Sequence, residues 1–369
     1  MLNLTMAIDI IRWLQSSRQN FHLQLAMAGI LIQWYDFICF GIVGIAMFGA
    51  LYVLCCCKIK HQRYQILNGD HIDDNNIIGR HEILLPLQGC NQSSSSPSAV
   101  EFGSLSSSCW RGIHPVWLLA TRFGSLVVLC IFLTWDVLLY NYSIFVYYTE
   151  WTFTLLIVYF AIGTIISAYG CVRYYSNKSA PRPGDVIADH EMYNKAKTNK
   201  SMFKLQGQYY NEDTVPKRAS FWTYVLKISY QTCAGSVILT DIIFWFIILP
   251  YSSNSHLQLN LLMGGMHSLN IIFLLIDTSL NSLPLPWSGI AYFVLWSCCY
   301  VIFQWLIHAC GFIWWPYPFL ELSMPRAPLW YFCLTVFHLP CYGIYWLLVA
   351  FKNSTFSTLC PQAFVRHSC

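Results

Sequence analysis

The sequence predicts an all-α membrane protein, a bundle of about seven transmembrane helices. Three observations lead to this prediction. Only 10% of the residues are charged and 56% are hydrophobic, whereas a soluble domain needs about 25% charged residues to solvate its surface. The mean hydropathy is +0.47. Apolar runs of about 20 residues, long enough to cross a bilayer as helices, also recur along the chain.

Seven apolar runs are long enough to span. The first, about 26–57, is longer than a bilayer requires, so we expect it to tilt or to be trimmed. The second covers 116–139 and the third 143–169. The remaining four cover 224–250, 257–276, 290–314 and 329–351. Tryptophan and tyrosine gather near many of the ends, as they do at membrane interfaces: Trp110, Trp117, Tyr147, Tyr148, Trp222, Trp287, Trp314 and Trp330.

The spans and the polar stretches divide the chain into four parts. Residues 1–57 hold the first span and an N-terminal segment that mixes Arg12 and Arg18 with apolar residues, which predicts an interfacial amphipathic helix. Residues 58–111 include a serine run and are predicted to be a disordered cytosolic loop. Residues 112–351 form a six-span membrane core with a charged cytosolic loop, 173–220. Residues 352–369 form a cytosolic tail.

Lysine and arginine are distributed unequally between the two faces, which predicts the orientation. Loops 58–111 and 173–220 and the tail 352–369 lie on one face of the membrane. The other face holds only Arg12, Arg18 and Arg326. We therefore expect the N-terminus outside and the C-terminus in the cytosol of an endoplasmic reticulum or plasma membrane. The loops and tail hold Lys58, Lys60, Arg63, Arg80, Arg111, Arg173, Lys178, Arg182, Lys195, Lys197, Lys200, Lys204, Lys217, Arg218, Lys352 and Arg366.

Composition also limits the partners. The net charge of +4 is too small for a nucleic-acid interface, and the basic residues lie in loops and not in a stripe. No metal or organic cofactor is expected, and the expected partners are membrane lipids. Most of the 16 cysteines lie inside apolar runs and are interpreted as buried thiols. The triplet Cys55-Cys56-Cys57 differs, because it ends an apolar run beside lysines, where cysteines can be S-palmitoylated.

Ionisable residues inside spans are candidates for function, because each costs about 2.5–3.5 kcal/mol near the bilayer centre on insertion scales. For Arg122 and Asp241 we favour an ion pair between helices over catalysis. The candidates are Arg122, Asp136, Glu150, Lys227, Asp241, His267 and Asp277.

His267 lies about ten residues into the predicted fifth span, which places it roughly 15 Å deep, near the bilayer midplane. Gly264 and Gly265 beside it allow a neighbouring backbone or a lipid chain to approach. A neutral imidazole in this setting can act as a base toward a hydroxyl nucleophile. The alternative is a hydrogen-bonded histidine that serves packing.

Three segments resemble known membrane proteins. The runs 265–268 (GMHS) and 271–277 (IIFLLID) resemble the G-M-H-T segment and following apolar-acidic run of the androgen-induced protein family, and 317–321 (YPFLE) resembles its Y-P-F-L-E stretch. Residues 148–156 (YTEWTFTLL) are similar to the related rolling stone proteins and to uncharacterised plant membrane proteins of that group. The resemblance covers roughly residues 149–348.

Members of the androgen-induced protein family are polytopic hydrolases of fatty acid esters of hydroxy fatty acids that use a threonine and a histidine. The resemblance places Thr149 on the threonine and His267 on the histidine, with Thr154 as the reserve nucleophile. The alternative to a nucleophilic role, for Thr149 and Thr154 alike, is a hydroxyl that hydrogen-bonds the preceding helical turn, as threonines in helices commonly do. The chain departs from the family at Gly264, where a second histidine is often found, and in its first span and loop 58–111, which have no counterpart in the shorter members.

Two function classes follow. The first is an intramembrane lipid-ester hydrolase, in which Thr149 attacks the acyl carbonyl of a fatty acyl ester and His267 takes its proton. The second is a non-catalytic membrane protein, either a scaffold, adhesion or fusion factor or a transporter. Transport predicts internal repeats or matching broken helices in two halves, and the sequence shows neither clearly.

Overall fold

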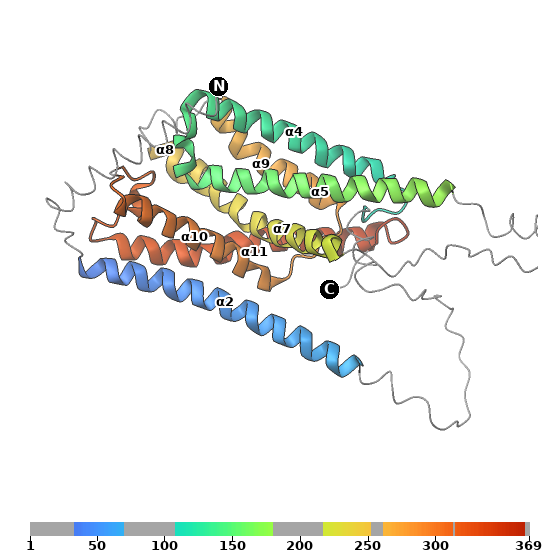
Figure 1. Cartoon of the computed structure of the whole chain (residues 1–369), viewed down its shortest axis with the longest axis horizontal. Helices are drawn as coiled ribbons and strands as arrows, with labels where there is room; N and C mark the ends of the chain where they lie inside the picture. Colours follow the sequence, from blue (N-terminus) through green and yellow to red (C-terminus); the bar gives the residue numbers. More distant parts are fainter. Residues whose placement is uncertain (1–32, 70–107, 180–216, 252–260, 313, 366–369) are drawn as a thin grey trace, which may run out of the picture.

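The computed structural model describes residues 33–69, 108–179, 217–251, 261–312 and 314–365. The predicted amphipathic helix within 1–20 lies outside these ranges, as do most of loop 58–111 and most of loop 173–220. The described part is an all-α bundle in which seven helices are long and apolar enough to cross a membrane (Figure 1). The protein is therefore a multi-pass membrane protein, as the sequence predicted.

All seven predicted spans correspond to helices, with shifted boundaries. The helices are α2 (Trp34–Gly69), α4 (Pro115–Tyr140), α5 (Tyr148–Ser179), α7 (Lys217–Ile243), α9 (Leu261–Leu280), α10 (Ile290–Ala309) and α11 (Ala327–Leu359). A π-helical turn, η2 (Phe244–Ile248), and the short α8 (Leu249–Tyr251) continue α7. Three short 3₁₀ turns connect other helices: η1 (Asn141–Val146), η4 (Trp287–Gly289) and η5 (Pro318–Leu320).

Three predicted boundaries were wrong. The helix α2 continues through Gly69, beyond the predicted end at 57, and α11 continues to Leu359, beyond 351. The predicted third span began at 143, but residues 141–146 form the 3₁₀ turn η1 and α5 begins at Tyr148. The apolar residues of this turn are indistinguishable by hydropathy from those of a span, which explains the early predicted start.

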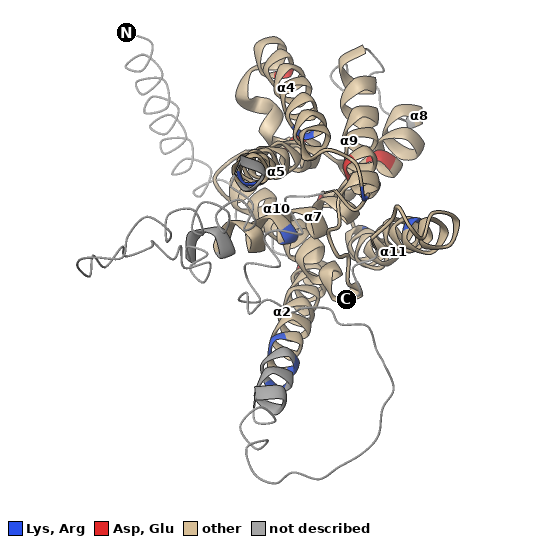
Figure 2. Ribbon diagram, turned by 90° about the vertical axis from the view of Figure 1, so that its right-hand side faces the viewer, with Lys and Arg blue, Asp and Glu red and all other residues tan. Residues whose placement is uncertain are grey.

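Helix α7 is the centre of the bundle, in contact with α5, α9, α10 and α11 (Figure 2). Every residue from 229 to 240 is buried, so this part of α7 is covered on all sides. Small side chains in this stretch, among them Ala234, Gly235 and Ser236, let the neighbouring helices approach closely. Phe293 of α10 takes the space beside Gly235.

Helix α2 lies at the edge of the bundle and packs against α10 and α11 (Figures 1 and 2). Most of its surface is exposed, as at Ile45 (76%) and Phe48 (68%), while Cys39 and Val43 are buried. Apolar side chains that face outward are expected where the surroundings are lipid. Cys55 and Cys57 are exposed free thiols near the far end of the apolar part of α2.

One end of the bundle, called here the C-terminal end, joins the start of α4 to the ends of α9 and α11. The backbone N–H of Cys109 donates to Leu280 O at 2.9 Å, and that of Arg111 donates to Ala363 O at 2.6 Å. An isolated antiparallel bridge pairs Trp110 with Phe364. The chain beyond α11, part of the predicted tail 352–369, is thus docked on the bundle as far as Val365.

Candidate functional site

A cavity lies between α5, α7, α10 and α11, toward the end of the bundle opposite the C-terminal end. Its empty volume, including the space open to its surroundings, is about 540 Å³. Most of the lining is aliphatic or aromatic, and hydroxyls and one imidazole supply the polar groups. The lining residues are Tyr148, Thr149, Leu239, Thr240, Ile243, Ile248, Ser297, Tyr300, Val301, Tyr317, Phe319, Leu320, Leu334 and His338.

Thr149, the predicted nucleophile, is one of these lining residues and the second residue of α5. Its side chain lies beside the hydroxyl of Tyr317, a residue in the connection between α10 and α11. The Tyr317 oxygen also accepts the backbone N–H of Tyr148 at 3.2 Å. Burial raises the pKa of the Tyr317 hydroxyl, so this group stays protonated and keeps a hydrogen to donate.

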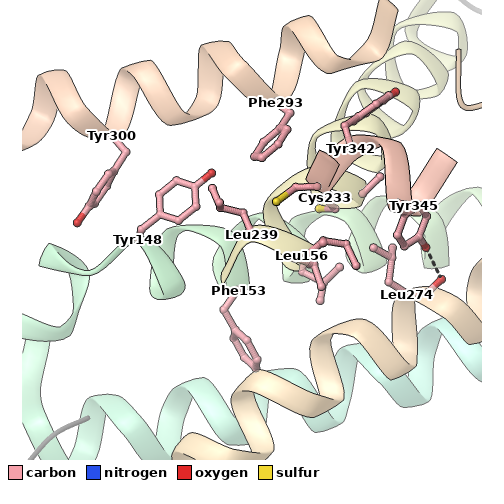
Figure 3. Close-up of a cluster of buried hydrophobic side chains, with 14 of the residues drawn as sticks. Tyr148, Phe153, Leu156, Cys233, Leu239, Leu274, Phe293, Tyr300, Tyr342 and Tyr345 are labelled. Carbon is pink, nitrogen blue, oxygen red and sulfur yellow. Dashed lines mark hydrogen bonds between the residues drawn. The ribbon is translucent and has the colours of Figure 1, made fainter. Parts of the chain in front are cut away.

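Tyr148 and Ser297 form a second polar group in the cavity wall. Their hydroxyl oxygens are 2.8 Å apart and share a hydrogen bond. The ring of Tyr148 packs edge-on against Tyr300 with centroids 5.0 Å apart, and Figure 3 shows these two rings side by side at one end of the buried cluster. Two neutral donors, the Tyr148 hydroxyl and the Tyr317 hydroxyl, therefore flank Thr149.

His338 of α11 is the imidazole of this cavity, and the sequence analysis missed it. Its Nδ1 lies 2.7 Å from the backbone oxygen of Leu334, one turn earlier in α11. The ring packs against Phe293 with centroids 4.5 Å apart. The rule that selected His267, an ionisable residue deep inside an apolar run, would also have selected His338, which lies near the middle of the seventh predicted span.

His267 does not line the cavity. Its ring stacks on Phe244 at a centroid distance of 3.8 Å, and its Nδ1 lies 3.5 Å from Oδ1 of Asp241. Asp241 also accepts a hydrogen bond from the Asn270 side chain at 2.9 Å. At 100° per residue, Asp241 lies about 100–160° around α7 from Leu239, Thr240 and Ile243, which line the cavity.

The depths of Thr149 and His267 differ as well. His267 is the seventh residue of α9, so it lies roughly 9 Å along that helix, and Thr149 lies roughly 1.5 Å along α5. The predicted depth of Thr149, roughly 9 Å, was too large because α5 begins at Tyr148 and not at 143. Among the described residues no hydrogen bond or ion pair joins the two side chains.

The other sequence features at this end of α5 and α9 have different roles from those expected. Thr154, the reserve nucleophile, does not line the cavity, and its shielded hydroxyl has no partner within the described residues. The close approach allowed by Gly265 is made by the ring of Phe132 from α4, where the sequence suggested a backbone or a lipid chain. Of the two candidate nucleophiles, Thr149 faces the cavity and Thr154 does not.

The predicted partner of Arg122 was wrong. Arg122 pairs with Asp277 and not with Asp241: its Nε lies 2.7 Å from Oδ1 of Asp277, and both side chains are buried. Asp277 also accepts hydrogen bonds from the hydroxyl of Tyr159 and, at 2.7 Å, from the side chain of Asn281. This buried network joins α4, α5 and α9 near the C-terminal end, so Arg122 has the structural role that the sequence analysis favoured.

Lys352 was assigned to the cytosolic tail, but it lies in α11 and is buried. Its Nζ donates to the backbone oxygens of Thr278 and Asn281 at 2.7 and 2.9 Å. These carbonyls end α9, where no following turn supplies donors. Lys352 therefore acts as a cap for α9.

Asp136 of α4 and Glu150 of α5 are both buried. Within the described ranges, no group of three or more histidine, cysteine or acidic side chains is arranged to hold a metal ion.

No family model, curated protein or solved structure matches this chain.

Proposed function

We propose that this multi-pass membrane protein hydrolyses fatty acyl esters in the cavity beside Thr149. The observation that carries the proposal is the position of Thr149 in the wall of a largely apolar cavity among membrane-spanning helices. The resemblance of residues 149–348 to the androgen-induced protein family supports the same reaction class and the same threonine.

In the proposed reaction, the Thr149 hydroxyl oxygen attacks the acyl carbonyl carbon and its proton passes to an imidazole. The hydroxyls of Tyr317 and Tyr148 donate to the oxyanion as it forms. The tetrahedral intermediate expels the alcohol, which takes the proton from the imidazole. Water then attacks the acyl-threonine ester by the same route, releases the fatty acid and restores Thr149.

The cavity favours His338 over His267 as this imidazole. His338 lines the same cavity as Thr149, whereas the ring of His267 is held between Asp241 and Phe244 on another face of α7. A catalytic role for His267 requires that its ring leave this packing and approach α5.

A fluorophosphonate probe applied to the detergent-solubilised protein tests the nucleophile. Thr149→Ala is expected to lose labelling at least tenfold, and Thr154→Ala, the same change on the same helix away from the cavity, is expected to label as the wild type does. Comparable labelling of Thr149→Ala and wild type would reject the nucleophile. His338→Ala and His267→Ala, checked for intact folding by size-exclusion chromatography, identify the base.

A non-catalytic function is the second candidate, and the packing of His267 favours it. An imidazole held by a carboxylate and an aromatic ring is a stable structural element of the bundle. The second candidate, a lipid-binding scaffold, replaces the hydrolase under two conditions. The probe must label neither the wild type nor any variant, and the protein must still bind acyl lipids in the cavity.

The proposed orientation has the N-terminus outside and the C-terminus in the cytosol, in an endoplasmic reticulum or plasma membrane. It rests on the excess of lysine and arginine in loops 58–111 and 173–220. In sealed microsomes, a tag after Cys369 should be digested by added protease without detergent. Protection of that tag until detergent is added would reverse the orientation.

A further inference from the structure

A second cavity lies on the other side of His338, between α2, α10 and α11. Its empty volume is about 410 Å³. It shares Ser297, Val301, Leu320, Leu334 and His338 with the first cavity, and Val43 and Ala46 of α2 form its outer wall. The first span, which the sequence analysis left without a role, thus completes a second cavity. The remaining lining residues are Val294, Cys298, Tyr331 and Thr335.

The hydrogen bonding of His338 defines what this shared wall offers to a ligand. The backbone oxygen of Leu334 can only accept, so His338 Nδ1, 2.7 Å away, must carry the hydrogen. In the neutral ring the other nitrogen, Nε2, is then an acceptor with a free lone pair. His338 Nε2 is buried and has no hydrogen-bond partner within the described residues.

The neighbouring polar groups in the second cavity already have partners. The Ser297 hydroxyl shares a hydrogen bond with Tyr148 and contacts Phe293 O at 3.2 Å. The Tyr331 hydroxyl donates to Leu320 O at 2.9 Å, and the Thr335 hydroxyl donates to Tyr331 O at 2.8 Å. The group without a partner is therefore an acceptor, His338 Nε2, and burying an acceptor without a donor is unfavourable.

The surroundings determine the class of molecule that can supply this donor. The outer wall belongs to α2, whose other face is exposed and apolar, so molecules that reach the cavity come from the hydrocarbon phase. The lining is mainly aliphatic and aromatic, which favours a hydrocarbon chain. A chain that also satisfies Nε2 must carry an N–H or O–H donor, and a hydroxyl is the smallest such group that remains neutral in lipid.

We infer that the second cavity binds a long-chain lipid alcohol whose hydroxyl donates to His338 Nε2 and whose chain lies between α2 and α10–α11. This binding goes beyond the proposed hydrolysis, because it breaks no bond and does not involve Thr149.

The test is photolabelling of the full-length protein in nanodiscs with a photoreactive long-chain alcohol and with its methyl ether. The two probes have the same chain, but the ether cannot donate a hydrogen bond. Labelled peptides of α2 and α11 are quantified by mass spectrometry. All proteins carry Thr149→Ala, so that loss of hydrolysis and loss of binding are distinguished.

The alcohol is expected to label α2 about three- to tenfold more than the ether, the range expected for one hydrogen bond. Ala46→Trp, which fills the cavity, should reduce this labelling at least fivefold, whereas Ile45→Trp, on the adjacent exposed position, should not. His338→Phe should label equally with both probes, and His308→Phe, a histidine that lines neither cavity, should keep the preference.

Equal labelling of the Thr149→Ala protein, with no second substitution, by alcohol and ether would overturn the hydrogen bond to His338. Unchanged labelling in Ala46→Trp, or equal losses in Ala46→Trp and Ile45→Trp, would overturn the assignment to this cavity. The comparison of the two probes needs no His338 variant, so it tests the hydrogen bond to His338 even where that variant fails to fold.

Discussion

The Nε of Arg122 on α4 donates to Oδ1 of Asp277 on α9 over 2.7 Å, and neither side chain reaches the surface. This ion pair fastens two helices that lie far apart in the sequence. The surrounding groups complete it, since Arg122 also donates to Ser167 at 2.8 Å and Asp277 accepts from Asn281. A buried charge with these partners costs far less than an isolated one.

Removing one partner of this pair should destabilise the bundle strongly. Arg122→Met leaves the Asp277 carboxylate buried without its counter-charge, so we expect a loss of about 3–5 kcal/mol in the free energy of unfolding. Thermal unfolding in detergent, followed by circular dichroism, measures it. The double variant Arg122→Met/Asp277→Leu should recover a large part of the loss. A double variant less stable than the single one would contradict this account.

Lys352 should stabilise the end of α9. Lys352→Met removes the donor to Thr278 O and Asn281 O and leaves two buried carbonyls unsatisfied, which should cost about 1–3 kcal/mol. Hydrogen exchange at the last turn of α9 is expected to rise in this variant. Lys352→Arg keeps a cation with several donors and serves as the control. Unchanged exchange in Lys352→Met would show that Lys352 does not cap α9.

Gly235 should not tolerate a side chain. A Cβ at this position would overlap the ring of Phe293, so Gly235→Ala should lower stability by about 1–3 kcal/mol through overpacking. Gly124→Ala is the matched control, because its Cβ would meet no atom within 4 Å. Thermal unfolding in detergent compares the two. Equal stability of both variants would mean that α7 and α10 are less closely packed than described here.

Cys109 and Cys360 should differ in reactivity. Burial raises the pKa of the Cys109 thiol, so at pH 8 little of it is the reactive thiolate, and its sulfur also lies against Ser279 O at 3.5 Å. Cys360 is exposed. Brief alkylation with iodoacetamide at pH 8, with peptides mapped by mass spectrometry, should modify Cys360 at least tenfold more than Cys109. Denatured protein, in which both thiols react, is the control, and equal rates in folded protein would contradict the docking of residues 108–111.

The sequence predicted the number and order of the spans because hydropathy over 20 residues is a strong signal. It could not predict the pairing of Arg122, because composition fixes the depth of a residue but not the rotation of its helix. Arg122 faces Asp277 because α4 packs on α9, and Asp241 faces His267 because of the rotation of α7. These pairings depend on how the helices pack and rotate in three dimensions, which the hydropathy of the sequence does not report.

The candidate site was partly predictable. Thr149 was selected by resemblance and does line a cavity, but its depth was misjudged because the 3₁₀ turn before α5 is as apolar as a helix. His338 was overlooked, although its position inside an apolar run was visible. The second cavity could not be predicted at all, because it depends on α2 packing against α10 and α11 across more than 240 residues of sequence.

The position of α2 has a consequence for biosynthesis. Among the helices of the described residues, α2 is translated before the others, yet it packs against α10 and α11, which are translated after the others. Until those two helices enter the bilayer, α2 must remain surrounded by lipid or be shielded by the insertion machinery. Translation arrested just before Ile290 should therefore leave α2 accessible to crosslinking with that machinery, and completion of α11 should release it.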